Sequence, residues 1–244
     1  MYGDAAAYYD ILTSDIDYGK YAMYFNDIFK RHMDRIPDAV MDLGCGTGSL
    51  TIKLAGMGYD MTGIDASPEM LGEAYAKGNP RILWINQDFT EIDLFGTYDA
   101  AVSLLDCVNH LPGEREVEKY FRLVHNYLNP GGLFVFDINS EYKFREVFSS
   151  NVFYSVSDDF TYIWQNDYID DERTCEMEIT IFIRENMLYK RVDTYNTERA
   201  YAVADMKDLL KKSGFDIVDV YNDLTFDEPG EKAERIFFVS RKEV

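Results

Sequence analysis

The sequence predicts an α/β fold: a doubly wound, mostly parallel sheet with a terminal antiparallel strand pair and an inserted antiparallel β-sheet. Three observations support this prediction. Strand and helix patterns alternate over residues 38–140, an arrangement typical of parallel sheets with right-handed crossovers. Residues 174–184 then alternate apolar and polar side chains with a period of two. Two further strand patterns, over 216–221 and 235–239, end the chain.

The alternating region is punctuated by recognisable helix starts and stops. Ser67 precedes Pro68 and is a good N-cap, because proline is favoured at the first helical position. The run 129–132, Asn-Pro-Gly-Gly, is expected to break the chain before an apolar, buried strand. The elements predicted here are strands over 39–41, 60–64, 81–85, 100–104 and 133–136, and helices over 49–58 and 114–128.

The chain divides into three regions within one structural domain. Residues 1–36 carry apolar side chains at helical spacing up to Pro37 and are expected to form an N-terminal helical cap. Residues 37–149 and 201–244, which include a helix over 205–213, form the cofactor-binding domain. Residues 150–200 form an inserted antiparallel lid over the acceptor region. In its clearest strand Cys175, Met177, Ile179, Ile181 and Ile183 share the apolar face.

Composition excludes several classes of protein. The chain has 244 residues and a net charge of −20, and its basic residues are scattered, so nucleic acid is not expected as a partner. Three widely spaced cysteines argue against both a disulfide framework and a zinc site, and no His, Asp and Glu residues have metal-ligand spacing. No signal peptide and no membrane-spanning apolar run is present, so a cytoplasmic location without membrane partners is expected.

The strongest motif is the glycine-rich turn over 40–48, Val-Met-Asp-Leu-Gly-Cys-Gly-Thr-Gly, between a strand and a helix. Gly44, Gly46 and Gly48 let the backbone turn tightly and approach a ligand closely. The spacing is GxGxG rather than the GxGxxG of dinucleotide binders. Asp42 stands just before the turn, where a carboxylate suits an ammonium group better than a pyrophosphate.

Two more carboxylates follow neighbouring strands. Asp65 closes the strand after the glycine turn, where a carboxylate can accept hydrogen bonds from both ribose hydroxyls of an adenosine cofactor. Asp88 follows the third strand and can accept from an adenine amino group, with Phe89 against the ring. The carboxyl ends of parallel strands form the ligand-binding edge of open α/β sheets. Together with Asp42, these acids therefore predict an adenosine-type cofactor site at that edge.

These motifs resemble those of class I S-adenosylmethionine-dependent methyltransferases, which have a Rossmann-like fold. The resemblance rests on the glycine turn 42–48, on Asp65 and on Asp88-Phe89, and the element order matches over essentially the whole chain. The segment 105–111, Leu-Asp-Cys-Val-Asn-His-Leu, is similar to the family's loop after the fourth strand. Within the family, the inserted sheet most resembles bacterial small-molecule enzymes such as glycine and amino-sugar N-methyltransferases.

The resemblance implies S-adenosylmethionine as cofactor, S-adenosylhomocysteine as product, and a set of cofactor-binding residues. The glycine turn would wrap the methionine moiety and ribose, Asp65 would hold the ribose hydroxyls, and two tyrosines of the N-terminal cap would cover the methionine carboxylate. The implied cofactor-binding residues are Tyr9, Tyr18, Asp42, Gly44, Cys45, Gly46, Gly48, Asp65, Ala66, Met70, Asp88, Phe89, Leu105 and Asp106.

The expected reaction is in-line methyl transfer to a small-molecule acceptor, with an amine favoured. His110 lies in the loop where the acceptor belongs and is either a general base or a histidine that packs at the pocket rim; Asp106 is the second candidate base. Candidate acceptor-binding residues are Tyr162, Arg199 and Tyr201. Tyr162 is otherwise a packing residue of a strand, and Arg199 is otherwise a surface or ion-pair residue.

Two other functions remain open at this point. A nicotinamide-dependent oxidoreductase would also place a glycine turn after the first strand, although the GxGxG spacing and Asp42 argue against it. A non-catalytic S-adenosylmethionine-binding protein would carry the same cofactor residues as an enzyme. The exposed face of the inserted sheet is, in addition, a candidate homodimer interface.

Overall fold

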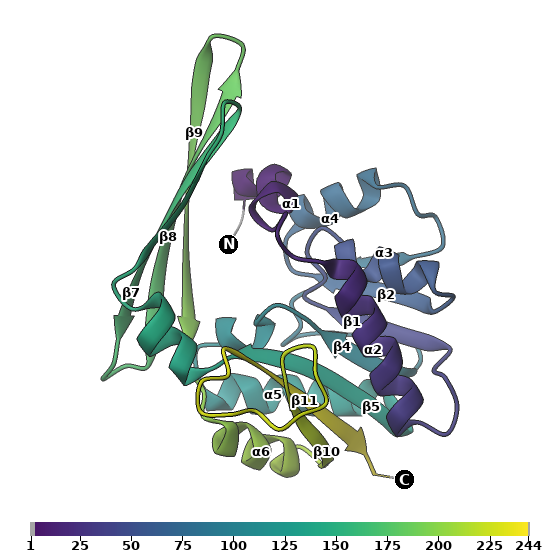
Figure 1. Cartoon of the computed structure of the whole chain (residues 1–244). Coiled ribbons are helices and arrows are strands. Elements are labelled where there is room, and N and C mark those ends of the chain that lie inside the picture. Colours follow the sequence, from purple (N-terminus) through teal and green to yellow (C-terminus); the bar gives the residue numbers. More distant parts are fainter. Residues whose placement is uncertain (1–2, 244) are drawn as a thin grey trace.

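The computed structural model describes residues 3–243 and confirms the predicted fold class. The main sheet has seven strands in the order β10-β11-β5-β4-β1-β2-β3. Neighbouring strands from β5 to β3 run parallel, whereas β11 pairs antiparallel with both β5 and β10 (Figure 1). The strand bounds are β1 Ala39–Leu43, β2 Asp60–Asp65, β3 Leu83–Asn86, β4 Tyr98–Ser103, β5 Leu128–Asn139, β10 Phe215–Asn222 and β11 Arg235–Lys242.

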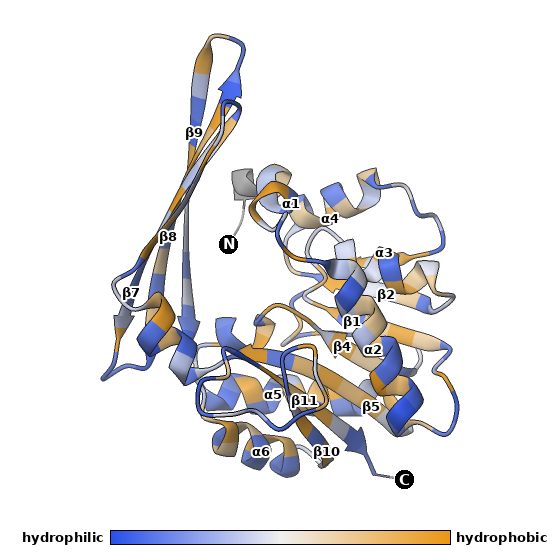
Figure 2. Cartoon of the chain, in the orientation of Figure 1, coloured by the Kyte–Doolittle hydropathy of each residue, from blue (hydrophilic) through white to orange (hydrophobic). Residues whose placement is uncertain are grey.

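Helices cover both faces of this sheet and create two hydrophobic cores. One core lies under α5 and α6, where the buried Phe134 and Phe136 of β5 pack. The other lies under α2, α3 and α4, where Leu133 and Val135 point, as alternation along a buried strand requires. Figure 2 shows the central strands as largely hydrophobic along their length. The helix bounds are α2 Tyr18–His32, α3 Ser49–Gly56, α4 Pro68–Ala76, α5 Glu114–Tyr127 and α6 Val203–Lys212.

The inserted region forms a separate four-stranded antiparallel sheet, β6-β7-β8-β9, that rises beside the main domain (Figure 1). Cys175, Met177, Ile179 and Ile181 of β8 are buried, so the predicted apolar face turns inward. Tyr8 and Leu12, from the N-terminal segment, pack against this face. The strand bounds are β6 Val152–Val156, β7 Phe160–Ile169, β8 Thr174–Glu185 and β9 Leu188–Arg199.

The N-terminal cap is divided into several short elements rather than one helix. A 3₁₀ turn η1 (Gly3–Tyr8) and a single helical turn α1 (Tyr9–Leu12) precede α2. Asp17 caps α2 by accepting a hydrogen bond from the Lys20 amide at 3.1 Å, which fixes where that helix begins. Two further helical turns, η2 (Cys107–His110) and η3 (Lys143–Phe148), follow β4 and β5.

The expected break at 129–132 is absent, because β5 already begins at Leu128. The pairing of β4 with β5 shifts register between Tyr98 and Ala100, which accommodates the proline and glycines within the strand. No helix in the described residues 3–243 is long and apolar enough to cross a membrane.

Candidate functional site

The glycine turn is anchored to the neighbouring strand through its backbone. The amides of Gly44 and Cys45 both donate to the Ile64 carbonyl, at 2.9 and 3.0 Å. Gly44 has a φ of 73°, in the left-handed region where glycine has no steric penalty. A Cβ at Gly44 would also lie 2.4 Å from Cys107 Sγ. Only glycine therefore fits here, where the turn meets the loop after β4.

Asp65 at the end of β2 is held by two backbone amides. Its Oδ2 accepts from Gly46 N at 2.8 Å, and its Oδ1 accepts from Ser67 N at 2.9 Å. A carboxylate can accept about four hydrogen bonds, so each oxygen keeps acceptor capacity for a ligand. Burial raises the pKa of Asp65, while these two amides lower it. The side chain is thus fixed in orientation, as recognition of a vicinal diol requires.

Asp88 and Asp42 occupy different environments. Asp88 is exposed, and its Oδ1 accepts from both the amide and the hydroxyl of Thr90 at 2.7 Å, which leaves Oδ2 for a ligand. Asp42 is buried at the end of β1 and accepts from Thr51 Oγ1 at 2.6 Å. Burial raises the pKa of Asp42 to about 7. Asp42 therefore gains most from a cationic neighbour, which would restore its charged form.

One large cavity of about 1040 Å³ joins these groups. It runs from the glycine turn past the N-terminal cap to the inner face of the inserted sheet. Thirteen of the fourteen predicted cofactor-binding residues line it. They are Tyr9, Tyr18, Asp42, Gly44, Cys45, Gly46, Asp65, Ala66, Met70, Asp88, Phe89, Leu105 and Asp106.

Gly48, the fourteenth of these residues, does not line the cavity. Its φ is 74°, and a Cβ there would lie 2.3 Å from Cη2 of Trp84 and 3.1 Å from Cβ of Ala74. Gly48 therefore leaves room for the Trp84 ring, beneath the start of α3. Its role in this structure is packing.

Two of the three predicted acceptor residues are also placed elsewhere. Arg199 donates from Nη1 to the Glu172 carbonyl at 3.1 Å, in the turn between β7 and β8. Tyr201 is buried and donates to the Leu111 carbonyl at 2.6 Å. Neither residue lines the cavity, whereas Tyr162 does. Arg199 and Tyr201 thus hold the base of the inserted sheet.

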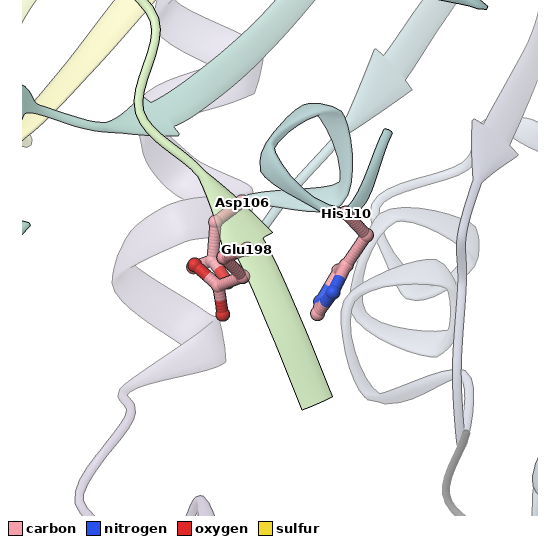
Figure 3. Close-up of side chains that lie close together, drawn as sticks. All are labelled: Asp106, His110 and Glu198. Atoms are coloured by element: carbon pink, nitrogen blue, oxygen red, sulfur yellow. The ribbon is translucent and has the colours of Figure 1, made fainter. Parts of the chain in front are cut away.

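At the far side of the cavity Asp106, His110 and Glu198 come together from the loop after β4 and from β9 (Figure 3). One ligand-type atom of each lies within 4.8 Å of the other two. Leu105 and Asp106 have φ values of 63° and 55°, so this loop holds two consecutive residues in the left-handed region. Backbone strain of this kind persists where the surrounding structure fixes it and is frequent at functional sites.

Two cationic side chains lie beside these acids. Arg235 Nη2 contacts Asp106 Oδ1 at 2.8 Å, and its Nη1 contacts the buried Asp137. Lys143 Nζ donates to Asn139 Oδ1 at 3.0 Å, and Asn139 Nδ2 donates to Glu198 Oε2 at 3.0 Å. Glu198, Lys143 and Arg235 were not predicted as site residues from the sequence.

The charges of this network follow from burial. Burial raises the pKa of Glu198 well above its ordinary value, and the charge of Asp106 adds to the effect. Burial alone would raise the pKa of Asp106, but the positive charge of Arg235 outweighs this effect, so the pKa of Asp106 is lowered. Burial lowers the pKa of His110, although Asp106 favours its protonated form. His110 Nδ1 is buried and has no hydrogen-bond partner within residues 3–243.

The same three side chains are of the types that bind divalent cations, which the sequence spacing did not indicate. Glu198 is distant in sequence from Asp106 and His110, so no local motif connects them. Arg235 already binds one Asp106 oxygen, and Lys143 adds positive charge beside Glu198. A divalent ion would have to compete with these two cations for the carboxyl oxygens of Asp106 and Glu198. A singly charged or neutral amine needs less negative charge around it in order to bind.

Comparison with known proteins agrees with this geometry. Residues 40–132 match the family model described as "Methyltransferase domain". "Putative methyltransferase YqeM" of Bacillus subtilis is 34% identical over 99% of this chain and 97% of its own length. A glycine/sarcosine N-methyltransferase of Halorhodospira halochloris is 30% identical over 50% of this chain and 48% of its own length.

A crystal structure of an S-adenosylmethionine-dependent methyltransferase from Clostridium acetobutylicum superimposes with a TM-score of 0.88. The two proteins are 31% identical, and the match covers 100% of this chain and 99% of the other. The sugar N-methyltransferase KedS8 of a Streptoalloteichus species has the same fold, with a TM-score of 0.83 at 17% identity over 97% and 93% of the two chains. The chain therefore belongs to the class I S-adenosylmethionine-dependent methyltransferase family.

Proposed function

We propose that this methyltransferase transfers the methyl group to the nitrogen of a small-molecule amine. The observation that carries the proposal is the group Asp106, His110 and Glu198, which shares one cavity with the glycine turn and Asp65. The carboxylate of Asp106 attracts an ammonium ion, the carboxyl group of Glu198 accepts a hydrogen bond from it, and a neutral imidazole accepts its proton. Relatives described as glycine/sarcosine N-methyltransferases, although matched over only half of this chain, point in the same direction.

The residues around the glycine turn fit the cofactor. Asp65, fixed by the amides of Gly46 and Ser67, would accept from the ribose hydroxyls, and Asp88 Oδ2 would accept from the adenine amino group. Asp42, whose pKa burial raises to about 7, would face the cationic methionine portion. When bound there, S-adenosylmethionine supplies a methyl group on a positively charged sulfur, which a neutral nitrogen can attack.

The protein's own part is to bind, orient and deprotonate the acceptor. Glu198 and Asp106 would hold the acceptor nitrogen, and His110 Nδ1 would take the proton that frees its lone pair. Tyr9, Tyr18 and the strained loop at Leu105 line the cavity between the N-terminal cap and the glycine turn and would exclude water there. Most of the rate enhancement would then come from positioning, as expected for a cofactor that is already activated.

Production of S-adenosylhomocysteine with a panel of primary and secondary amines tests this function. We expect N-methylated products by mass spectrometry, and we expect Glu198→Gln to lower kcat/KM while the affinity for S-adenosylmethionine stays at the wild-type value. Glu176→Gln is the matched control, because Glu176 lies on the exposed face of the same sheet. Methylation confined to hydroxyl or carbon acceptors would refute the proposal.

A further inference from the structure

We infer that the acceptor is an amine on a flat apolar body, larger than an amino acid such as glycine, and that it carries no carboxylate. This inference rests on the proposed N-methyltransferase function and names the substrate class of the same site. It is carried by the size of the cavity, by the aromatic and apolar lining of its outer half, and by the charges around the position of the amine.

The cavity has room for more than the cofactor. Its volume is about 1040 Å³, and it extends from the glycine turn to the inserted sheet. Cavities of roughly 300–1,000 Å³ enclose one drug-sized ligand, so this one is at the top of that range. An acceptor as small as glycine would leave the part beside the inserted sheet open to water, which a methyl-transfer site excludes.

The outer half presents a continuous apolar surface. Tyr162 and Trp164 of β7 stand beside Ile181 and Ile179 of β8 in the sheet register. Phe148 of η3 contacts Trp164 with ring centroids 5.3 Å apart, so the indole ring is held in place. All but Ile181 line the cavity, and Met177 of β8 does as well. A flat apolar body packs against such a surface through burial of area and offset ring contacts.

Two polar groups of β9 beside this surface favour a cationic amine, whereas the buried Nε1–H of Trp164, which has no hydrogen-bond partner among residues 3–243, fits an acceptor atom elsewhere on the ligand. Asn196 is 7% exposed, lines the cavity, and has no hydrogen-bond partner for its Oδ1 in the part of the chain that the structure describes. It lies two residues before Glu198, so both side chains share the inner face of β9. An oxygen of Asn196 and a carboxyl of Glu198 both accept hydrogen bonds, and an ammonium group donates several.

A carboxylate on the acceptor would meet unfavourable charges. Asp106 is the charged acid beside Glu198, and Arg235 is already bound to the carboxylates of Asp106 and Asp137. Lys143 donates to Asn139 and lies over the Phe148 ring at 5.0 Å. The lining of the whole cavity contains further acids, among them Glu116, Asp223 and Glu234, whereas Lys143 and Arg235 are the only Lys or Arg residues among the described residues that line it. Like charges brought together in this way cost several kcal/mol.

Matched acceptor pairs test the inference with the whole protein and S-adenosylmethionine. Tryptamine and tryptophan differ only in the carboxylate, as do phenethylamine and phenylalanine, and glycine serves as the small acceptor. We expect each arylalkyl amine to exceed its amino acid and glycine by at least about 100-fold in kcat/KM, the ratio that a repulsion of several kcal/mol produces. The N-methylated product is identified by mass spectrometry.

Variants of Trp164 show whether a loss of activity comes from weaker binding of the apolar part of the acceptor or from a loss of folded protein. Trp164→Ala should lower kcat/KM for tryptamine by roughly 10-fold or more, the loss expected when a hydrophobic contact is removed. Trp164→Phe should restore most of it. Tyr195→Ala, on the exposed face of the same sheet, should have no effect. The affinity for S-adenosylmethionine should match the wild type in all three.

The outcomes distinguish this inference from the proposed function. Glycine or tryptophan methylated as efficiently as tryptamine would overturn the inference and leave N-methylation intact. Failure of every arylalkyl amine, both as substrate and as a ligand of the S-adenosylhomocysteine complex at millimolar concentration, would overturn the inference as well. Only the absence of N-methylation with every amine, glycine included, would overturn both.

Discussion

Substituting Gly48 by alanine tests whether this glycine serves packing rather than cofactor contact. The added Cβ would lie 2.3 Å and 3.0 Å from two atoms of the Trp84 ring and 3.1 Å from Cβ of Ala74. The Trp84 side chain is buried and belongs to the core under α3 and α4, so it has little freedom to move. The backbone would also have to keep its φ of 74° with an L side chain.

The two effects add to a large loss of stability. A left-handed conformation costs a non-glycine residue roughly 1–2 kcal/mol, and overpacking of a well-filled core costs about 1–3 kcal/mol. We therefore expect Gly48→Ala to lower the free energy of unfolding by about 2–5 kcal/mol. The affinity of the folded variant for S-adenosylmethionine should stay close to wild type, because Gly48 does not line the cavity.

Urea unfolding of matched alanine variants separates the cost of the left-handed backbone conformation from the cost of overpacking. Gly58→Ala keeps a φ of 104° but meets nothing within 4 Å, so it should lose only about 1–2 kcal/mol. Gly72→Ala lies inside α4 with no neighbour within 4 Å and should gain about 0.5–1 kcal/mol. In a Trp84→Leu background the cost of Gly48→Ala should fall toward that of Gly58→Ala, because only the 3.1 Å approach to Cβ of Ala74 remains. Equal losses for Gly48→Ala and Gly58→Ala in the wild-type background would refute the packing role.

Two further predictions concern the charged side of the cavity. Arg235→Met leaves Asp106 and Asp137 unpaired and should lower the free energy of unfolding by about 3–5 kcal/mol in urea titrations. The control Arg122→Met, which removes an exposed ion pair, should lower it by only about 0.2–1 kcal/mol. A smaller loss for Arg235→Met than for Arg122→Met would contradict the buried network. Because burial lowers the pKa of His110 below 6.5, its neutral form persists to lower pH, and its contribution to stability is present above pH 6.5 and declines as the pH falls below it. The acid limb of kcat/KM for an amine that stays an ammonium ion throughout the pH range should therefore lie below pH 6.5 and disappear in His110→Gln; a limb unchanged in that variant would exclude His110 as the base.

The cofactor half of the site could be predicted from sequence because it is built from local motifs. A glycine turn after a strand, and carboxylates at two successive strand ends, have fixed places in a parallel sheet. Asp65 and Asp88 consequently lie in the cavity, as predicted. Gly48 belongs to the same motif, yet its role depends on Trp84, a residue of another strand whose contact leaves no trace in the local pattern.

The acceptor half could be predicted only in part, because its residues meet through the tertiary fold. Asp106 and His110 share a loop and were identified, whereas Glu198, Lys143 and Arg235 come from other segments. Arg199, a predicted acceptor residue, does not line the cavity, whereas its neighbour Glu198 does. Side chains alternate along a strand, so a shift of one position exchanges the inner face for the outer one. The burial of Val192, Thr194, Asn196 and Glu198 at alternate positions of β9 is known only from the structure, because three of the four are polar and leave no apolar pattern in the sequence.

Calorimetric titration with S-adenosylmethionine, S-adenosylhomocysteine and NAD, for the wild type and for Asp65→Ala, tests the central claim most directly. Asp65 is the carboxylate that the Gly46 and Ser67 amides orient at the end of β2, where a ribose would bind. We predict that the wild type binds S-adenosylmethionine and S-adenosylhomocysteine but not NAD. Asp65→Ala should lose both while keeping its fold by circular dichroism. Binding of NAD alone, or undiminished S-adenosylmethionine binding by Asp65→Ala, would contradict the assignment of this site.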